Sequence, residues 1–229
     1  MVYLKKFTTV DEYNSFKRSL AKNYVSYISS TGEVKYDKGM PEGVYIQHID
    51  GSLYTTDDWT AGGFSNDLAN GVAVVAAQCG FVVAKTDISS SSTKWYSSDI
   101  AVDGLFTTAD EAVALVDYNG VTNTQVIISQ LSSGAAYSCA NYEFPNGQKG
   151  YLPALGELAV MRDNITLVQS ALGLIGGDYV LTGQSSNKYW SSTQGSDTNA
   201  WLLFGNASFG VSSVSKKAGY AYIRPFAAL

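Results

Sequence analysis

Short apolar runs, each ended by a glycine, asparagine or aspartate turn, set the strongest limit on how this chain can fold. Residues 43–50 alternate as a strand does, and Asp50-Gly51 is a hairpin signal that makes residues 52–56 the partner strand. Residues 71–85 contain two further buried strands, separated near Gln78–Gly80. Because no stretch of about 18 apolar residues occurs, we expect no transmembrane helix.

Helical patterns are few and are spread between these strands. Thr9 and Glu12 have the spacing of a capping box, ahead of an apolar repeat that predicts a helix over about residues 10–22. Further elements are predicted as strands over 25–28 and 33–36 and as helices from Thr107 or Thr108 through Leu115, over 122–131, 153–162 and 165–174. We therefore expect an α+β fold, with a small N-terminal segment over residues 1–42 and one larger domain over residues 43–229.

The low charge of the chain excludes some partners. Only 15% of residues are charged and the net charge is −5, whereas glycine (22) and tyrosine (16) are frequent. A nucleic-acid-binding protein would show a basic stripe, and an acidic surface disfavours anionic membranes. Lys5-Lys6 is not followed by the apolar region of a signal peptide. We expect synthesis in the cytoplasm, with a virion or a dedicated export system as carrier if the protein acts outside the cell.

The supply of reactive side chains is equally limited. Cys79 and Cys139 are the two cysteines, and they form either buried free thiols or one disulfide. His48 is the one histidine, so most zinc and iron sites and most nucleophile–histidine pairs are excluded. It lies within an apparent strand, where we expect a structural or surface role. Adjacent acids such as Asp57-Asp58 are typical of helix caps and solvated charges. No enzyme activity, metal or cofactor is expected.

Four motifs follow one another in the last third of the chain: GYLPALGEL (150–158), YWSST (189–193), AWLLF (200–204) and AYIRPFAAL (221–229). In this order they resemble a bacterial and phage family of C-type-lectin-fold proteins, related to the formylglycine-generating or sulfatase-modifying proteins. The likeness covers about residues 43–229 and is strongest to the variable proteins of diversity-generating retroelements, of Bacteroides type or from phage. The resemblance implies a C-type-lectin-like fold, with short strands and a few helices, and a role in ligand binding.

The resemblance also implies a fixed framework made of Glu157, Trp190, Trp201 and Arg224. The tryptophans suit half-buried positions because each carries one N–H donor on a large apolar ring. The hydroxyls of residues 191–193 can satisfy backbone groups in a turn. A buried Arg224 needs a carboxylate or several carbonyl oxygens around it, and Glu157 is the candidate partner.

The implied ligand face lies in the last forty or so residues of the chain. Carried onto this sequence, its members are Gly195, Asp197, Asn199, Leu202, Phe204, Asn206, Ser208, Phe209, Val211, Ser213, Tyr220 and Tyr222. Tyrosine would supply rigid contacts and serine or asparagine adaptable hydrogen bonds, to a cell-surface protein or glycan. The family's stretch is denser in asparagine and tyrosine. We expect Leu203, Phe204 and Ile223 to be core residues and Asn206, Ser208 and Tyr220 to be exposed.

Two other classes of function stay open. A structural subunit of a phage virion or surface appendage would bury the same face, or the helix over residues 10–22, against another copy or a virion partner. A sulfatase-modifying-like enzyme would need a deep pocket that contains Cys79, Cys139 or His48, since the formylglycine-generating relatives use a cysteine pair near copper. Lectin-type loops can also bind calcium, but no EF-hand spacing is present, and we expect no metal.

Overall fold

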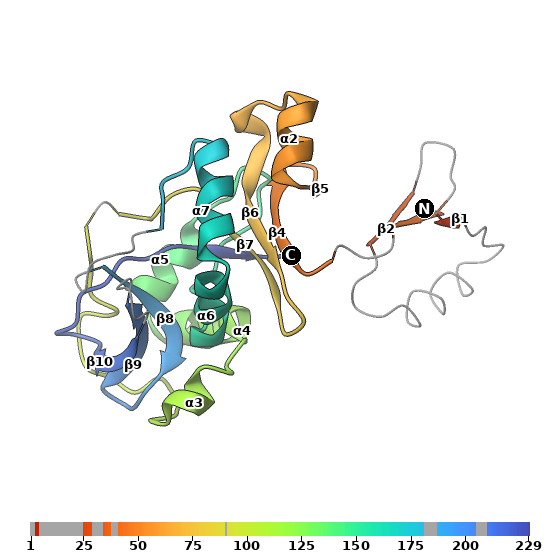
Figure 1. Cartoon of the computed structure of the whole chain (residues 1–229). Coiled ribbons are helices and arrows are strands. Elements are labelled where there is room, and N and C mark those ends of the chain that lie inside the picture. The colour runs from red at the N-terminus through yellow and green to blue at the C-terminus, as the bar shows by residue number, and fades with distance from the viewer. Residues whose placement is uncertain are drawn as a thin grey trace. The chain divides into compact units, whose positions relative to one another are not determined.

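The computed structural model describes residues 41–89, 91–180, 187–204 and 210–229, together with the backbone of three strands nearer the N-terminus. The chain divides into two compact units, Met1–Gly43 and Val44–Leu229 (Figure 1). The sequence places this division after residue 42. The helix predicted over residues 10–22 lies outside the described residues.

The N-terminal unit contains a three-stranded antiparallel sheet in the order β1-β3-β2. Its strands are β1 (Tyr3–Leu4), β2 (Val25–Ile28) and β3 (Val34–Asp37). In the pairing of β2 with β3, Tyr27 lies opposite Lys35. Both strands that the sequence predicts here are confirmed, with β3 beginning and ending one residue later than predicted.

The second unit is built on a five-stranded sheet in the order β11-β7-β6-β4-β5. Its strands are β4 (Gly43–His48), β5 (Leu53–Tyr54), β6 (Ala69–Val75), β7 (Gly80–Val83) and β11 (Phe226–Ala228). The predicted hairpin of β4 and β5 is confirmed, and Gly51 takes the left-handed conformation that its turn requires (φ 91°). The C-terminal strand β11 pairs antiparallel with β7 and forms one edge of this sheet.

Helices lie in two stretches of the chain, one between β5 and β6 and one after β7. They are α2 (Thr56–Gly62), the 3₁₀ turn η1 (Asn66–Leu68), α3 (Glu111–Ala114), α4 (Gly120–Gln130), α5 (Ala135–Asn141), α6 (Leu155–Asp163) and α7 (Ile165–Leu174). The helices predicted over 122–131, 153–162 and 165–174 are confirmed with small shifts of their ends. Pro153 precedes the first residues of α6 instead of lying within its first turn.

Three details of these helices differ from the prediction. Asp110, and not Thr107 or Thr108, caps α3, because its carboxylate accepts the N–H groups of Ala112 and Val113. No helix is predicted over residues 56–62, although Thr55 caps α2 by accepting the N–H of Asp58. No helix is predicted over residues 135–141 either, because the small residues of α5 carry no apolar repeat.

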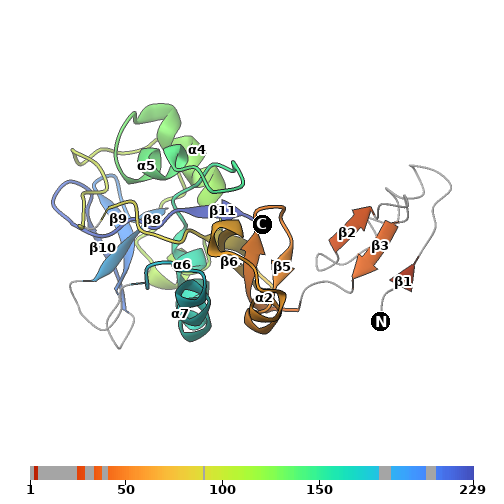
Figure 2. The ribbon, with the colours of Figure 1, turned by 90° about the horizontal axis from the view of Figure 1, so that it is seen from above.

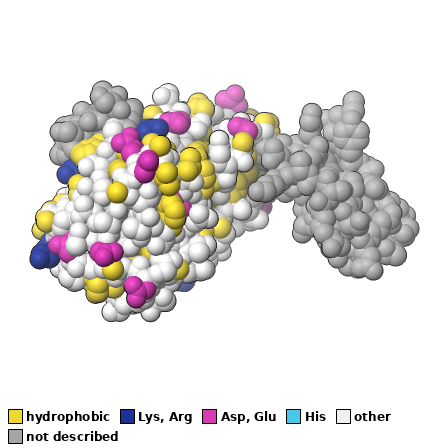
Figure 3. Space-filling view, turned by 90° about the horizontal axis from the view of Figure 1, so that it is seen from below, with side chains coloured by type: hydrophobic (Ala, Val, Ile, Leu, Met, Phe, Trp, Pro, Cys, Tyr) yellow, Lys and Arg dark blue, Asp and Glu magenta, His cyan; other side chains and the backbone are white. Residues whose placement is uncertain are grey.

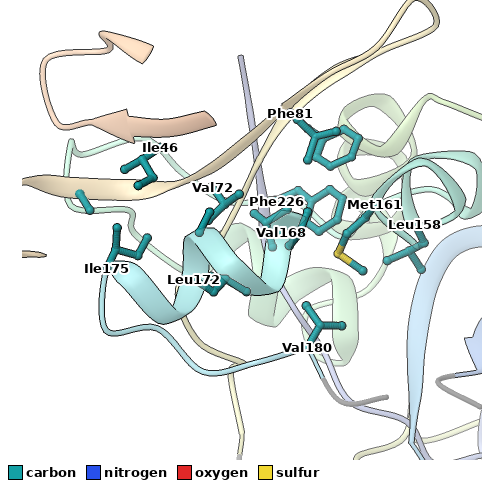
Figure 4. Packing of buried hydrophobic residues seen from close by; sticks show 14 of the residues in the cluster. Ile46, Val72, Phe81, Leu158, Met161, Val168, Leu172, Ile175, Val180 and Phe226 are labelled. Carbon is teal, nitrogen blue, oxygen red and sulfur yellow. The ribbon is translucent and has the colours of Figure 1, made fainter. Parts of the chain in front are cut away.

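The main core lies between the five-stranded sheet and helices α6 and α7 (Figure 4). Val72 and Phe226 reach into it from the sheet, and Val168 and Leu172 reach into it from α7. The rings of Phe81 and Phe226 are stacked with centroids 4.5 Å apart. This burial of apolar surface is the main source of stability for the unit.

A second antiparallel sheet, in the order β10-β9-β8, completes the unit. It consists of β8 (Lys188–Gln194), β9 (Asn199–Phe204) and β10 (Val211–Ser215). Seen from above, β8 and β9 lie between α4 and α5 on one side and α6 and α7 on the other (Figure 2). Antiparallel sheets with interspersed helices give the α+β class that the sequence predicts. Of the helices described, none has the length and apolar content to cross a membrane.

Candidate functional site

Five of the twelve residues of the predicted ligand face lie in the strands of the small sheet, and the register of the sheet fixes which side chains share a side. Leu203 lies opposite Tyr189 on β8 and Val211 on β10. Leu202 lies opposite Trp190 and Ser212. Neighbouring residues of a strand point to opposite faces, so the two sets face opposite ways.

Each face of β8 and β9 is covered by its own core. Leu202 and Trp190 pack with Ile127 of α4 and with α5. Tyr189 and Leu203 pack on the other side with the α6 and α7 core. Strands buried on both faces have little surface to offer a ligand, which leaves β10 and the connecting turns as the accessible part of the sheet.

The predicted face residues therefore divide into three groups. Asp197 and Tyr220 are exposed, and Tyr220 retains 50% of its accessible surface. Partly exposed are Asn199, Phe204, Val211, Ser213 and Tyr222. Gly195 and Leu202 are buried. Asn206, Ser208 and Phe209 lie outside the described residues.

Leu202 is the main correction to the predicted face. Its side chain is fully buried in the core that includes Trp190 and Ile127. The physical reason is that both faces of β9 are covered, so the alternation that exposes one face of a one-sided sheet does not apply here. Leu203 and Ile223 are core residues, as predicted. Phe204, also predicted to be a core residue, is only partly buried and packs at the border of the core. The ammonium of Lys188 lies 5.6 Å from the centroid of the Phe204 ring.

Three indole N–H groups join the small sheet to loops that are distant in sequence. Trp190 donates to the carbonyl oxygen of Thr93 (2.8 Å), and Trp201 donates to that of Thr108 (2.8 Å). Trp95 donates to the carbonyl of Ser191 (2.9 Å). The sequence predicts half-buried positions for Trp190 and Trp201, but both are buried. They can be buried because these carbonyl oxygens satisfy the one polar group of each ring inside the protein.

The hydroxyls of residues 191–193 lie in β8 and not in a turn, and all three residues are buried. The register of β8 shifts between Trp190 and Gln194, which places these residues at a β-bulge. Ser191 donates to the carbonyl of Trp201 (2.8 Å), and Thr193 accepts the N–H of Leu155 at the start of α6 (2.9 Å). The hydroxyls thus bind the sheet to the helix layer.

A buried carboxylate that the sequence analysis does not single out completes this connection. Asp117 accepts from the hydroxyl of Thr193 (2.8 Å) and the amide of Asn123 (2.8 Å) on one oxygen. Its other oxygen accepts from the backbone and side chain of Asn119. Four donors from neutral groups therefore replace the water that burial removes. The only signal in the sequence is Asp117-x-Asn119, the spacing of a local side-chain turn.

Glu157 has a different neighbourhood from the one predicted for it. Its carboxyl accepts the N–H of Ala154 at the start of α6 (2.8 Å) and bonds with the hydroxyl of Tyr151 (2.9 Å). Burial is the largest effect on this group and, together with nearby Asp117, raises its pKa to about 7 against the lowering effect of its hydrogen bonds. Gly120 lies so close to this carboxyl that a side chain there would collide with it.

Arg224 is buried, but its carboxylate partner is Asp87 and not Glu157. Asp87 also accepts from the hydroxyl of Tyr189 (3.0 Å). The remaining guanidinium N–H groups donate to backbone carbonyl oxygens of Ala84, Lys85, Asp178 and Tyr179. The sequence predicts a carboxylate or several carbonyl oxygens around Arg224, and both are present, but the carboxylate comes from the loop after β7.

A second buried cation, that of Lys216, was not predicted. Its ammonium donates to the carbonyls of Ile100 (2.7 Å) and Asp197 (3.0 Å) and to the side-chain oxygen of Gln194. The ring of Trp95 lies 5.0 Å from the nitrogen. Burial lowers the pKa of Lys216 to about 8, against the opposing effect of nearby aspartates. The cation fixes the β8–β9 turn, which carries Asp197, against the end of β10.

Exposed apolar side chains outside the predicted face lie on the segment that contacts Trp201 of β9. Phe106 and Val113 are exposed, and Val116 retains 63% of its surface. Two neighbouring residues hold the segment that carries Phe106 and Val113 against β9. The carbonyl oxygen of Thr108 accepts from the indole of Trp201, and Ala114 packs on that ring. Seen from below, where α3 lies nearest, hydrophobic side chains form separate groups among uncharged polar atoms (Figure 3).

The residues suspected of catalysis lie apart from this surface. His48 belongs to an aromatic cluster, with its ring 5.7 Å from that of Phe64 and 6.2 Å from that of Tyr54. Cys79 and Cys139 are both free, and burial raises the pKa of Cys79 to about 12. Within the described ranges, no group of three or more histidine, cysteine, aspartate or glutamate side chains is placed to hold a metal ion.

Comparison with known proteins adds little to this geometry. No protein-family model matches the chain, and no curated protein matches it. A solved structure of a fimbrial protein from Bacteroides ovatus ATCC 8483 is similar, with 15% identity and a TM-score of 0.48. The match covers 83% of this chain and 49% of that protein, so the chain spans about half its length. A likeness this distant supports no argument about function.

The Arg224–Asp87 pair gives the first prediction. Replacing Arg224 by methionine leaves the carboxylate of Asp87 buried without its cation, so we expect unfolding in urea to show a loss of about 3–5 kcal/mol. The matched control is Lys149→Met, which breaks an ion pair whose two side chains are each 61% exposed and should change stability little. Equal losses in the two variants would contradict the structural role of Arg224.

Glu157 gives a prediction about pH. Its pKa is raised in the folded protein, so its contribution to stability is full below the pKa of the unfolded chain and is lost as pH rises through about 7. As pH rises from about 5 to about 8, the free energy of unfolding of the neutral variant Glu157→Gln should increase relative to that of the wild type, by up to about 3 kcal/mol. Thermal melts across this range measure the difference. Exposed Glu111→Gln should follow the wild type, and a pH-independent effect of Glu157→Gln would refute the assignment.

Proposed function

We propose that this chain is a non-catalytic recognition module with a C-type-lectin-like fold, which binds a cell-surface protein or glycan through its C-terminal face. The accessible part of that face is β10, the β8–β9 turn with Asp197, and the segment that carries Tyr220 and Tyr222. Phe106 and Val113 extend it on the side of α3.

The order of the C-terminal motifs supports the C-type-lectin-like assignment. The GYLPALGEL motif leads into α6, the YWSST and AWLLF motifs lie in strands β8 and β9 of the small sheet, and Arg224-Pro225 precedes strand β11. The motif residues Trp190, Trp201 and Arg224 are all buried and bonded within the scaffold. This arrangement is what a fixed framework beneath a changeable surface requires.

One observation carries the proposal: the accessible face residues lie on a scaffold whose own side chains are fixed by hydrogen bonds. The turn that carries Asp197 is held by the ammonium of Lys216, and β9 is held by the indole of Trp201. A preorganised surface loses less conformational entropy on binding than a flexible one. Tyrosine and serine are side chains that antibody loops use for the same purpose.

A structural subunit of a virion or surface appendage is the second candidate. The exposed side chains of Phe106, Val113 and Val116 favour it, because neighbouring exposed apolar residues often mark protein contacts. In that case the C-terminal face would be buried in an assembly instead of binding a receptor.

A binding screen tests the proposed face. The labelled full-length chain is applied to intact bacterial cells and to a glycan array, together with the double variant Asp197→Ala, Tyr220→Ala. Both residues are exposed, and we expect binding to fall at least about tenfold, since large aromatic contacts dominate many interfaces. Tyr137→Ala removes an exposed tyrosine from α5 and should bind as the wild type does. Unchanged binding by the double variant would exclude this face.

The retroelement assignment has a separate test. Sequencing the DNA beside the coding region should reveal a reverse-transcriptase gene and an imperfect copy of the segment that encodes residues 189–229. The two copies should differ mainly at adenines. A neighbourhood without either element would remove diversification from the proposal while leaving the binding face to be judged by the screen.

A further inference from the structure

The outer edge of β10 is open. In the sheet order β10-β9-β8, strand β10 is bonded on one side only, and Figures 1 and 2 both place it at the outside of the sheet. All five of its residues, Val211–Ser215, are partly exposed. An edge strand of this kind is a template for another strand.

The hydrogen-bond pattern shows which backbone groups point outward. Lys216 donates to the carbonyl of Thr198 (2.9 Å), and Phe204 donates to that of Gly210 (2.8 Å). Bonded positions alternate along an antiparallel strand, so the groups of Ser212 and Val214 point toward β9. Those of Val211, Ser213 and Ser215 point away from it.

Most of these outward backbone groups lack a hydrogen-bond partner among the described residues. Within the part of the chain that the structure describes, the backbone N–H and C=O groups of Val211 and Ser213 have no hydrogen-bond partner. The carbonyl of Ser215 accepts from Gly219, but the N–H of Ser215 points outward as well. Soluble proteins usually protect such an edge with lysine, proline or a covering segment. The sequence Val-Ser-Ser-Val-Ser contains neither a charge nor a proline.

We propose that β10 is a dimerisation edge, at which β10 of a second copy pairs antiparallel about a two-fold axis through Ser213. In this register Ser213 faces Ser213 of the second copy, and Val211 faces Ser215 of the second copy. One continuous sheet then runs through both molecules. The proposal goes beyond the proposed function and does not depend on it.

A second copy fits this edge because the outward positions are placed symmetrically about Ser213. A two-fold axis perpendicular to the sheet keeps each side chain on its own face, so it brings outward groups opposite outward groups. No charged side chain lies on the strand, and pairing therefore brings no like charges together.

The first test is the mass of the full-length chain in solution, measured by sedimentation and light scattering up to concentrations on the order of 100 µM. The wild type should dimerise. Ser213→Pro removes the outward N–H without touching a bond to β9, and it should weaken the dimer at least about tenfold. Ser213→Ala keeps that N–H and should dimerise as the wild type does. A monomeric wild type, or a dimer that folded Ser213→Pro leaves intact, overturns the proposal.

A cross-linking test decides the question even if the proline variant does not fold. In a Cys79→Ser background, Ser213→Cys places one thiol on the axis, so a short bis-maleimide should join two chains of that variant. Ser132→Cys carries an exposed thiol on a different part of the surface and should stay uncrosslinked under the same conditions. Failure of Ser213→Cys to cross-link, or equal cross-linking by both variants, rules out pairing at this edge.

Discussion

The buried guanidinium of Arg224 is the interaction on which the rest of the second unit depends. It lies just before the closing strand β11 and bonds the loop after β7 through Asp87, Ala84 and Lys85. Through the same head group it also bonds the segment after α7. A guanidinium suits this position because its planar donors can satisfy several acceptors at once while its charge is balanced by one carboxylate. A single side chain thereby joins the loop after β7 to the segment after α7.

Most other polar contacts inside the unit use neutral groups, which explains how a chain with so few charges builds a specific core. The hydroxyls of Ser191 and Thr193 bond β8 to β9 and to α6, and indole N–H groups bond the tryptophans to loops. Neutral groups are less costly to bury than ions, provided that each finds a partner. Among the described residues one buried side-chain atom, the hydroxyl oxygen of Thr93, has no partner.

The strands and several helices could be predicted from local patterns, because β-branched alternation and helical repeats are properties of neighbouring residues. The helix α7 begins and ends where its apolar spacing indicates. Burial was harder to predict. Leu202 looks like a face residue from its strand alone, and only the helices on both sides of β9 make it a core residue. The partners of Arg224 and Lys216 include Asp87 and Ile100, which lie in loops more than a hundred residues away in sequence and whose own surroundings give no signal. The sequence specifies what a buried cation needs but not which loop supplies it.

Gly195, beneath Ser213, has a consequence for how the surface can evolve. A methyl group at position 195 would overlap the hydroxyl of Ser213 and approach the indole nitrogen of Trp201. The two positions of this short turn therefore differ: a side chain at position 195 requires Ser213 to move, whereas Asp197, two residues later, is exposed. A lineage under selection for new specificity would be expected to accumulate replacements at the tip of the turn and to preserve its base.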